Sequence, residues 1–127
     1  MDTHIVFWLA LDPERISKNA NAAIEQARAS GEGIAISSVT FYELANVVTK
    51  GRVSVNRSLE SFLKQVETLF VNKPITATIA MKATTLPENY PKDPMDRIIG
   101  ATAIVEGLLL VTADARIQES KAVPVIW

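Results

Sequence analysis

The sequence predicts an α/β domain with a mainly parallel sheet flanked by helices. Short apolar runs at 33–37, 108–112 and 123–127 alternate with segments of helical periodicity. The 127 residues are 48% hydrophobic and 21% charged, which suits one buried core. No repeat, low-complexity tract or linker divides the chain, so one domain over 1–127 is expected. Strands separated by helices favour parallel pairing, because parallel neighbours need a crossover connection.

The first predicted elements are a helix and a buried strand. Residues 16–29 (ISKNANAAIEQARA) have helical spacing, and Gly31 and Gly33 follow as stop signals. Residues 33–37 (GIAIS) form a short apolar run that is typical of a strand inside a sheet.

Three further helices are expected in the middle of the chain. Residues 39–50 and 59–70 each carry apolar side chains at intervals of three or four positions. A brief strand around Val71 separates them from a helix at 75–86, which stops before Pro87. The alternation of helix and strand is therefore maintained.

The last elements repeat this pattern. A helix at 94–106 begins with a proline, whose fixed φ suits the first helical position, and Gly107 ends it. Residues 108–112 are apolar up to their threonine, as expected of a strand covered on both faces. Residues 123–127 (VPVIW) predict a final strand, which Pro124 places at an edge.

Composition excludes several kinds of site. The chain has no cysteine and one histidine, so disulfides, thiolate zinc centres and Cys–His nucleophiles are ruled out. His4 is expected to pack or hydrogen-bond near the N-terminus rather than act as a general base. Residues 1–11 are a poor secretory signal, and no apolar run reaches the ~20 residues of a membrane span. A cytoplasmic protein with no membrane partner is expected.

The net charge of −1 does not favour nucleic-acid binding by overall charge. Five acids stand out by position, and without them nine acids face thirteen Lys and Arg residues. The rest of the surface is then mildly basic, which permits an RNA partner. These five acids are Asp2, Glu43, Asp93, Asp96 and Asp114.

Each acid also has a purely structural interpretation. Asp93 precedes Pro94 at a helix N-cap, and Asp96 follows in the first turn, where negative charge is favoured. Thr40 and Glu43 fit a capping box, with Thr40 as the N-cap. Asp114 could cap a short turn over 115–119. Taken singly, each acid is better explained as a cap than as a ligand.

Their shared location favours a site. Glu43 and Asp114 each follow a predicted strand, Asp96 opens the helix before 108–112, and Asp2 precedes an apolar run. The carboxyl ends of parallel strands lie at one edge of a sheet, where ligands bind. Carboxylates gathered there repel one another and raise their pKa values, unless a cation joins them. Oxygen ligands alone indicate Mg²⁺ or Mn²⁺, which can activate water against a phosphate.

Three more residues are expected to support this site: Thr112 through its hydroxyl, Asp93 beside Asp96, and Arg97 as a phosphate-holding guanidinium or the partner of an acid. Aromatic side chains could stack on bases, but core packing is the better default for each of Trp8, Phe41 and Tyr42.

Four ordered motifs, DTHIVFW (2–8), SSVTFYELA (37–45), DPMDRIIGATA (93–103) and LLVTAD (109–114), resemble the PIN-domain family, most closely its VapC-type toxins. The resemblance extends to the ending VPVIW. It implies a PIN-like three-layer fold, a homodimer, an Mg²⁺- or Mn²⁺-dependent ribonuclease, and a cognate antitoxin that covers the active site. Carried over, the four acids are Asp2, Glu43, Asp96 and Asp114, with Asp2, Asp96 and Asp114 as metal ligands and Thr112 and Asp93 as supporting residues.

This chain departs from the family at its start. Family members have several apolar residues before the first aspartate, which form a central strand, whereas only Met1 precedes Asp2 here. We therefore expect a truncated first strand, with residues 1–5 supplying at most a stub of strand.

The sequence leaves three functions to compare. The leading one is an endoribonuclease toxin that cleaves RNA phosphodiesters and is neutralised by its antitoxin. The alternative is a catalytically impaired PIN-like module that dimerises or binds a partner. A phosphoryl-receiving signalling domain also gathers acids at a sheet edge, but it needs two adjacent acids and a late lysine, and this chain has Asp2 alone and Thr112-Ala-Asp114.

Overall fold

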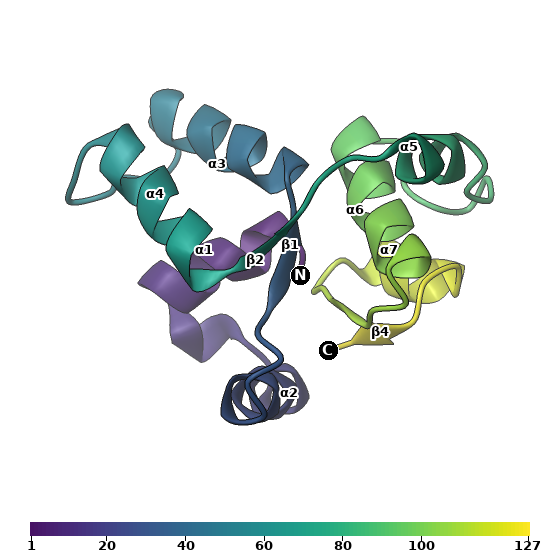
Figure 1. Cartoon of the computed structure of the whole chain (residues 1–127), viewed down its shortest axis with the longest axis horizontal. Helices are drawn as coiled ribbons and strands as arrows, with labels where there is room; N and C mark the ends of the chain where they lie inside the picture. The colour runs from purple at the N-terminus through teal and green to yellow at the C-terminus, as the bar shows by residue number, and fades with distance from the viewer.

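The computed structural model describes residues 1–127 and shows a PIN-like α/β fold with parallel strands. Two groups of helices stand on either side of the short strands, α1–α4 on one side and α5–α7 on the other (Figure 1). The helices are α1 (Thr3–Leu11), η1 (Pro13–Arg15), α2 (Lys18–Ala29), α3 (Val39–Thr49), α4 (Leu59–Leu69), α5 (Ala77–Thr84), α6 (Pro94–Val105) and α7 (Ala115–Ser120). None of them is long and apolar enough to cross a membrane.

The strands form two separate parallel pairs. Strand β1 (Ala35–Ser37) pairs with β2 (Val71–Lys73), with Ala35 opposite Val71. Strand β3 (Leu110–Val111) pairs with β4 (Val125–Ile126), with Leu110 opposite Val125. The strand predictions were right in position and orientation; β2 is brief as predicted, and the other three strands are shorter than the five-residue runs expected. The single sheet expected from the sequence is split into two pairs.

The chain start lies in the gap between the two pairs. The Met1 amino group donates to the Ala35 carbonyl on β1 at 2.9 Å, and the Asp2 N–H donates to the Val111 carbonyl on β3 at 3.0 Å. Consecutive residues that bond to opposite neighbours have the pairing of a strand between two others. Beyond Met1 this gap continues as a pocket of about 430 Å³, lined by residues 33–35 and by residues 107–109 on its two sides. We call this pocket the strand slot.

Residues 1–5 supply at most a stub of strand, as expected, because strand-like bonding stops at Asp2. Residues from Thr3 onwards form α1, with Asp2 at its N-cap. The helix buries Ile5, Val6 and Phe7 in the main core, and the Phe7 ring stacks on Phe62 of α4 with centroids 6.2 Å apart. A helix accommodates this run because consecutive apolar residues find apolar partners on several sides.

The other helices are close to prediction. The helix expected at 16–29 starts later, because Pro13–Arg15 forms a 3₁₀ turn and Ser17 caps α2 by accepting from the Ala20 N–H at 3.1 Å. Ser58 and Thr76 cap α4 and α5 in the same way. Serine and threonine hydroxyls satisfy N–H groups that have no partner inside a helix. The turn expected at 115–119 is the short helix α7.

Two large cores hold the halves of the fold. One gathers α1–α4, β1 and Val111 of β3, and the other gathers α6, α7, Leu110 of β3 and Val39 of α3. Tyr90, which is 1% exposed, crosses α6 at Gly100, where an added Cβ would collide with its ring and hydroxyl. The same hydroxyl donates to the carbonyl of Asp96 at 3.1 Å. Glycine is therefore required inside this helix, and the contact fixes the turn that carries Asp96.

Candidate active site

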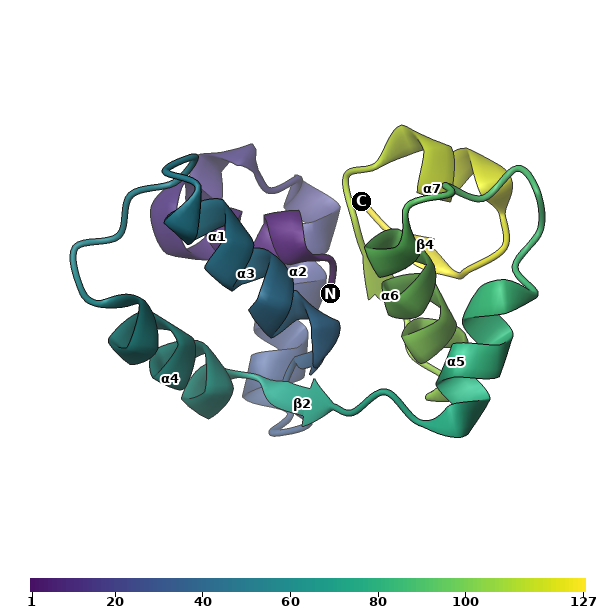
Figure 2. The same ribbon diagram turned by 90° about the horizontal axis from the view of Figure 1, so that it is seen from above.

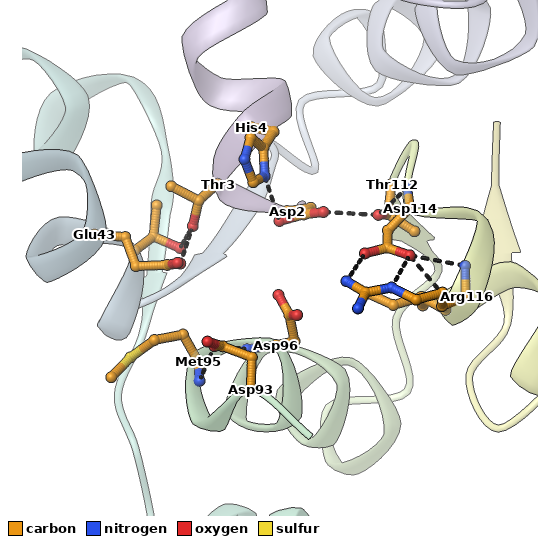
Figure 3. Close-up of polar contacts among 12 residues, drawn as sticks. Asp2, Thr3, His4, Glu43, Asp93, Met95, Asp96, Thr112, Asp114 and Arg116 are labelled. Carbon is orange, nitrogen blue, oxygen red and sulfur yellow. Dashed lines mark hydrogen bonds and ion pairs between the residues drawn. The ribbon is translucent and has the colours of Figure 1, made fainter. Parts of the chain in front are cut away.

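The side chains of Asp2, Glu43, Asp96 and Asp114 surround one space between the two halves of the fold (Figure 3). Asp2 precedes α1, Glu43 lies in α3, Asp96 lies in α6, and Asp114 caps α7. Figure 2 shows α1 and α3 on one side and α6 and α7 on the other. The acids predicted from strand ends are thus brought together by the fold.

Asp2 is the most buried of these acids, at 5% exposed. Thr112 donates from Oγ1 to Asp2 Oδ2 at 2.7 Å, and His4 Nδ1 lies 3.9 Å from Oδ1. Burial alone would raise the pKa of Asp2, but the contacts with His4 and Thr112 outweigh it and hold the pKa below its ordinary value. Asp2 is therefore a charged carboxylate at neutral pH. Its contact with Thr112 is consistent with a supporting role for that hydroxyl.

Glu43 does not form the expected capping box. Ser38, not Thr40, is the N-cap of α3, and the Glu43 carboxylate accepts a short hydrogen bond from Thr3 Oγ1. Thr40 is fully buried and its hydroxyl lies 3.4 Å from that of Thr3, whose closer partner is Glu43. Burial raises the pKa of Glu43, the Thr3 hydrogen bond opposes this, and the charge of Asp2 adds to it. The capping interpretation of Glu43 is therefore wrong.

Asp96 has the least compensated carboxylate of the group. No hydrogen bond or ion pair reaches its oxygens, which point into the shared space (Figure 3). Burial, followed by the charges of Asp2, Asp93, Glu43 and Asp114, raises the pKa of Asp96 to about 6. An unpaired, half-buried carboxylate among other acids is unfavourable for folding, and such groups are concentrated at functional sites.

Asp93 and Asp114 both act as helix caps, as their structural interpretation predicted. Asp93 Oδ1 accepts from the Met95 N–H at 2.9 Å and from the Asp96 N–H at 3.4 Å. Asp114 Oδ1 accepts from the Arg116 N–H at 2.8 Å and from the Ile117 N–H at 3.4 Å. Capping does not exclude a second role for Asp114, because only Oδ1 accepts the helix N–H groups.

Arg116 pairs with Asp114 through both of its carboxylate oxygens. The guanidinium Nη2 lies 2.8 Å from Oδ2, and Nε lies 3.3 Å from Oδ1. The hydrogen bond from Arg116, with the main-chain bonds of the cap, lowers the pKa of Asp114 despite a small opposing effect of burial. Sequence reasoning missed Arg116; its position two residues after Asp114 was the available signal. It also missed Thr3, which directly follows Asp2.

The expectation that Arg97 holds a phosphate or pairs with an acid disagrees with its contacts. Its guanidinium donates to the main-chain carbonyls of Ala83 at 2.9 Å, Leu86 at 2.9 Å and Pro91 at 3.3 Å. These bonds tie the end of α5 and the following loop to α6. The geometry of a guanidinium fork suits such multiple acceptors, and it leaves Arg97 no free face for a ligand.

The packing of the aromatic residues and of His4 can be compared with the expectations. Trp8 packs on Trp127, with Arg15 stacked over its ring at 4.1 Å, and Phe41 packs against the main core, as expected. Tyr42 is 59% exposed, so the expectation of core packing was wrong there. The His4 side chain is 73% exposed and its Nδ1 lies 3.9 Å from Asp2 Oδ1, which is too long for a hydrogen bond, so the expectation that His4 packs or hydrogen-bonds was wrong. The nearby Asp2 carboxylate is the main cause of the raised pKa of His4.

The carboxylates at this site are the type of ligand that a hard divalent cation prefers, but they are too far apart in this structure to coordinate one ion together. The carboxylate oxygens of Asp2, Asp96 and Asp114, with Glu43 beside them, are the ligands that Mg²⁺ and Mn²⁺ prefer. The raised pKa of Asp96 indicates uncompensated negative charge at this place. However, no three acidic or histidine side chains approach closely enough to hold one ion in the arrangement shown. For Asp114 to join such a site, its carboxylate would have to exchange Arg116 for the cation.

Comparisons with known proteins agree with this geometry. A family model described as the PIN domain matches residues 1–122. Ribonuclease VapC22 of Mycobacterium tuberculosis is 34% identical over 121 residues, which cover 95% of this chain and 90% of the relative. A crystal structure of VapBC2 from Rickettsia felis, bound to a DNA fragment from its promoter, superposes with a TM-score of 0.72 at 20% identity, covering 98% of this chain and 93% of the other. The acid cluster lies within the matched residues, and the chain belongs to the PIN-domain family.

Proposed function

We propose that this protein is a divalent-metal-dependent endoribonuclease of the toxin type. The observation that carries the proposal is the convergence of four acids from four separate segments on one space, with Asp96 left without any partner. A fold that needed these acids only as caps would not place them against one another, because their mutual repulsion is unfavourable. The similarity to a ribonuclease over almost the whole chain supports the same function.

In this proposal Asp2, Asp96 and Asp114 bind Mg²⁺ or Mn²⁺. Such an ion supplies charge neutralisation at the phosphate and a more acidic bound water. Asp2 is already charged and oriented by Thr112, and Asp96 releases its proton at a pH near 6. Glu43 has one oxygen held by Thr3, which leaves the other available to accept a proton from the attacking water. Burial raises the pKa of Glu43 above its ordinary value, which makes its carboxylate a better proton acceptor.

The partners follow the same proposal. The substrate is RNA, and a cognate antitoxin inhibits the protein by covering the acid cluster. The similar solved structure is a VapBC2 complex bound to promoter DNA, which supports an antitoxin partner for this chain. We also propose that the protein is a homodimer and that it acts in the cytoplasm.

The test compares three proteins on labelled RNA in Mg²⁺, in Mn²⁺ and in EDTA. Native protein is expected to cleave RNA only with a metal ion, and Asp96→Asn is expected to be inactive. Asp12→Asn, which removes an exposed acid at the opposite end of α1 from Asp2, is the matched control and is expected to cleave as the native protein does. Equal cleavage by native protein and Asp96→Asn would show that the assigned site is wrong.

The second candidate is a partner-binding module that no longer cleaves. The open spacing of the acids favours it, since no three of them hold an ion together in the arrangement shown. Titration calorimetry with Mn²⁺ separates the two functions. An enzyme of the proposed kind binds Mn²⁺ in the native form and loses this binding in Asp96→Asn, whereas a module without a metal site shows no binding heat in either protein.

A further inference from the structure

A second polar feature lies directly beside the acid cluster. It is an open groove of about 560 Å³ between the loop before α6 and the short helix α7. We call it the α7 groove; its lining residues are Asn89, Tyr90, Pro91, Lys92, Arg116, Glu119 and Ser120. The loop and α7 are joined across the groove by Asn89, whose side-chain amide donates to the Ser120 carbonyl at 3.3 Å. The groove is therefore a defined surface and not a gap between loose segments.

The groove places two cations next to two acids of the cluster. Lys92 is exposed and immediately precedes Asp93, and Arg116 is bonded to Asp114. Arg116 also lies within the electrostatic influence of Asp96 and Asp93. Its side chain is 70% exposed, so one face of the guanidinium remains open to a ligand while the other holds Asp114. Glu119 is the one acid in the lining.

Three other cations have partners elsewhere in the fold. Arg97 bonds three carbonyls, Lys73 pairs with Glu106 at 2.8 Å, and Arg15 stacks on Trp8. Five acids, counting Asp93, would by themselves repel a polyanion from the site. Cations beside the acids are needed to hold the phosphates on either side of the one that is cleaved, because backbone contacts fix the register of a nucleic acid.

We infer that the α7 groove binds the sugar–phosphate backbone of single-stranded RNA as it leaves the acid cluster, with Lys92 and Arg116 each contacting a phosphate. This inference rests on the proposed function and adds the path of the substrate to it. Arg116 has two alternative anionic partners, Asp114 in the free protein and a phosphate in the complex. Its transfer to the phosphate would release Asp114 toward the cluster, so RNA binding and closure of the acids are linked.

The experiment measures binding of a fluorescently labelled single-stranded RNA by anisotropy, with the full chain carrying Asp96→Asn so that no cleavage occurs. Lys92→Gln and Arg116→Gln are added singly and together. The matched control is Lys18→Gln with Lys64→Gln, which removes the same charge from exposed positions on α2 and α4. Thermal melts monitored by circular dichroism confirm that each variant is folded.

The groove double variant is expected to bind about tenfold more weakly than the control at 0.1 M salt, since each lost phosphate contact removes a share of counterion release. The slope of log affinity against log salt is expected to fall by about 1.4, the value for two contacts to a single strand. Lys92→Gln alone must weaken binding, because Lys92 is not paired with Asp114 and the substitution cannot act through that acid. Arg116→Lys, which keeps the charge, should recover part of the affinity.

The result that overturns the inference is a groove variant that binds RNA as tightly as the control with the same salt slope. Absence of RNA binding by Asp96→Asn itself overturns it equally. If native protein cleaves RNA while the groove variant binds normally, the nuclease function stands and only the groove assignment fails. If the groove variant loses affinity but native protein does not cleave, the groove assignment stands and the nuclease function fails.

Discussion

Thr3 donates a hydrogen bond from its hydroxyl to the carboxylate of Glu43, forty residues further along the chain. Thr3 is 3% exposed and lies directly after Asp2, so one dipeptide supplies both an acid and the donor that orients a second acid. The bond opposes the rise in the pKa of Glu43 that burial causes.

Thr3→Val is therefore expected to raise the pKa of Glu43 and to leave its carboxylate poorly oriented. Cleavage should fall by about tenfold or more, since hydrogen bonds to charged groups contribute about 1.5–3 kcal/mol. If Glu43 accepts the proton, the acidic limb of the pH–rate profile should move to higher pH. Thr3→Ser keeps the hydroxyl and is expected to restore both the cleavage rate and the native pH–rate profile. A Thr3→Val protein with an unshifted profile would contradict this role.

Asp96 links stability to pH. Its pKa is raised from 3.8 to about 6 in the folded protein, so the unfolded chain releases this proton first as pH rises. Stability is therefore lost between about pH 4 and pH 6, and the loss remains above that range. Because the carboxylate is half exposed, screening reduces the loss to about 1–2 kcal/mol. Asp96→Asn, without metal, is expected to melt a few degrees above native protein at pH 7.5.

The measurement is a pair of thermal melts in EDTA at pH 4.5 and pH 7.5. The gain from Asp96→Asn should shrink at the lower pH, where native Asp96 is mostly protonated. The control Asp12→Asn should give the same small difference at both values. A gain from Asp96→Asn that does not change with pH would mean that Asp96 is not destabilised by its neighbours.

Arg97 is predicted to matter for stability and not for RNA. Arg97→Gln removes donors from three main-chain carbonyls and is expected to destabilise the fold by about 2–4 kcal/mol. Urea unfolding measures this, with the exposed Arg52→Gln as a control that should change stability by less than about 0.5 kcal/mol. The folded fraction of Arg97→Gln should bind RNA as the native protein does. Weakened RNA binding by a fully folded Arg97→Gln protein would show that Arg97 does contribute to RNA binding.

The strand slot predicts the effect of an N-terminal extension. Five apolar, strand-forming residues added before Met1 can lie parallel to β1 and β3 and bond alternately to each, continuing the pattern that Met1 and Asp2 begin. Such an extension is expected to raise the melting temperature by several degrees, because it pairs buried main-chain groups. A Gly-Ser extension of the same length is the control. Equal melting of the two extended proteins would show that the slot does not accept a strand.

The sequence predicted most helices because their apolar spacing and their caps agree. Ser58 before α4 and Pro94 at the start of α6 are examples in which cap and periodicity indicate the same boundary. Helix α1 could not be predicted in this way, because Ile5, Val6 and Phe7 are consecutive and show no helical period. Its form depends on the core of α2, α3 and α4 that surrounds it, which only the folded chain reveals.

The positions of the acids could be predicted from the ends of strands, but their hydrogen bonds could not. Glu43 and Asp114 follow β1 and β3, so topology alone places them at one edge. Whether Glu43 turns to its own helix end or to Thr3 depends on how α1 packs on α3, and that packing joins segments forty residues apart. In the same way, the bonds of Arg97 depend on a loop whose path no local pattern indicates.

Asp2 and Glu43 belong to the half of the fold built on α1–α4, and Asp96 and Asp114 belong to the half built on α6 and α7. An ion shared by these four side chains would bind both halves of the fold and hold them together. Loading the protein with metal would then do more than prepare it for chemistry: it would make the two halves melt together, and removing the ion would let them move apart.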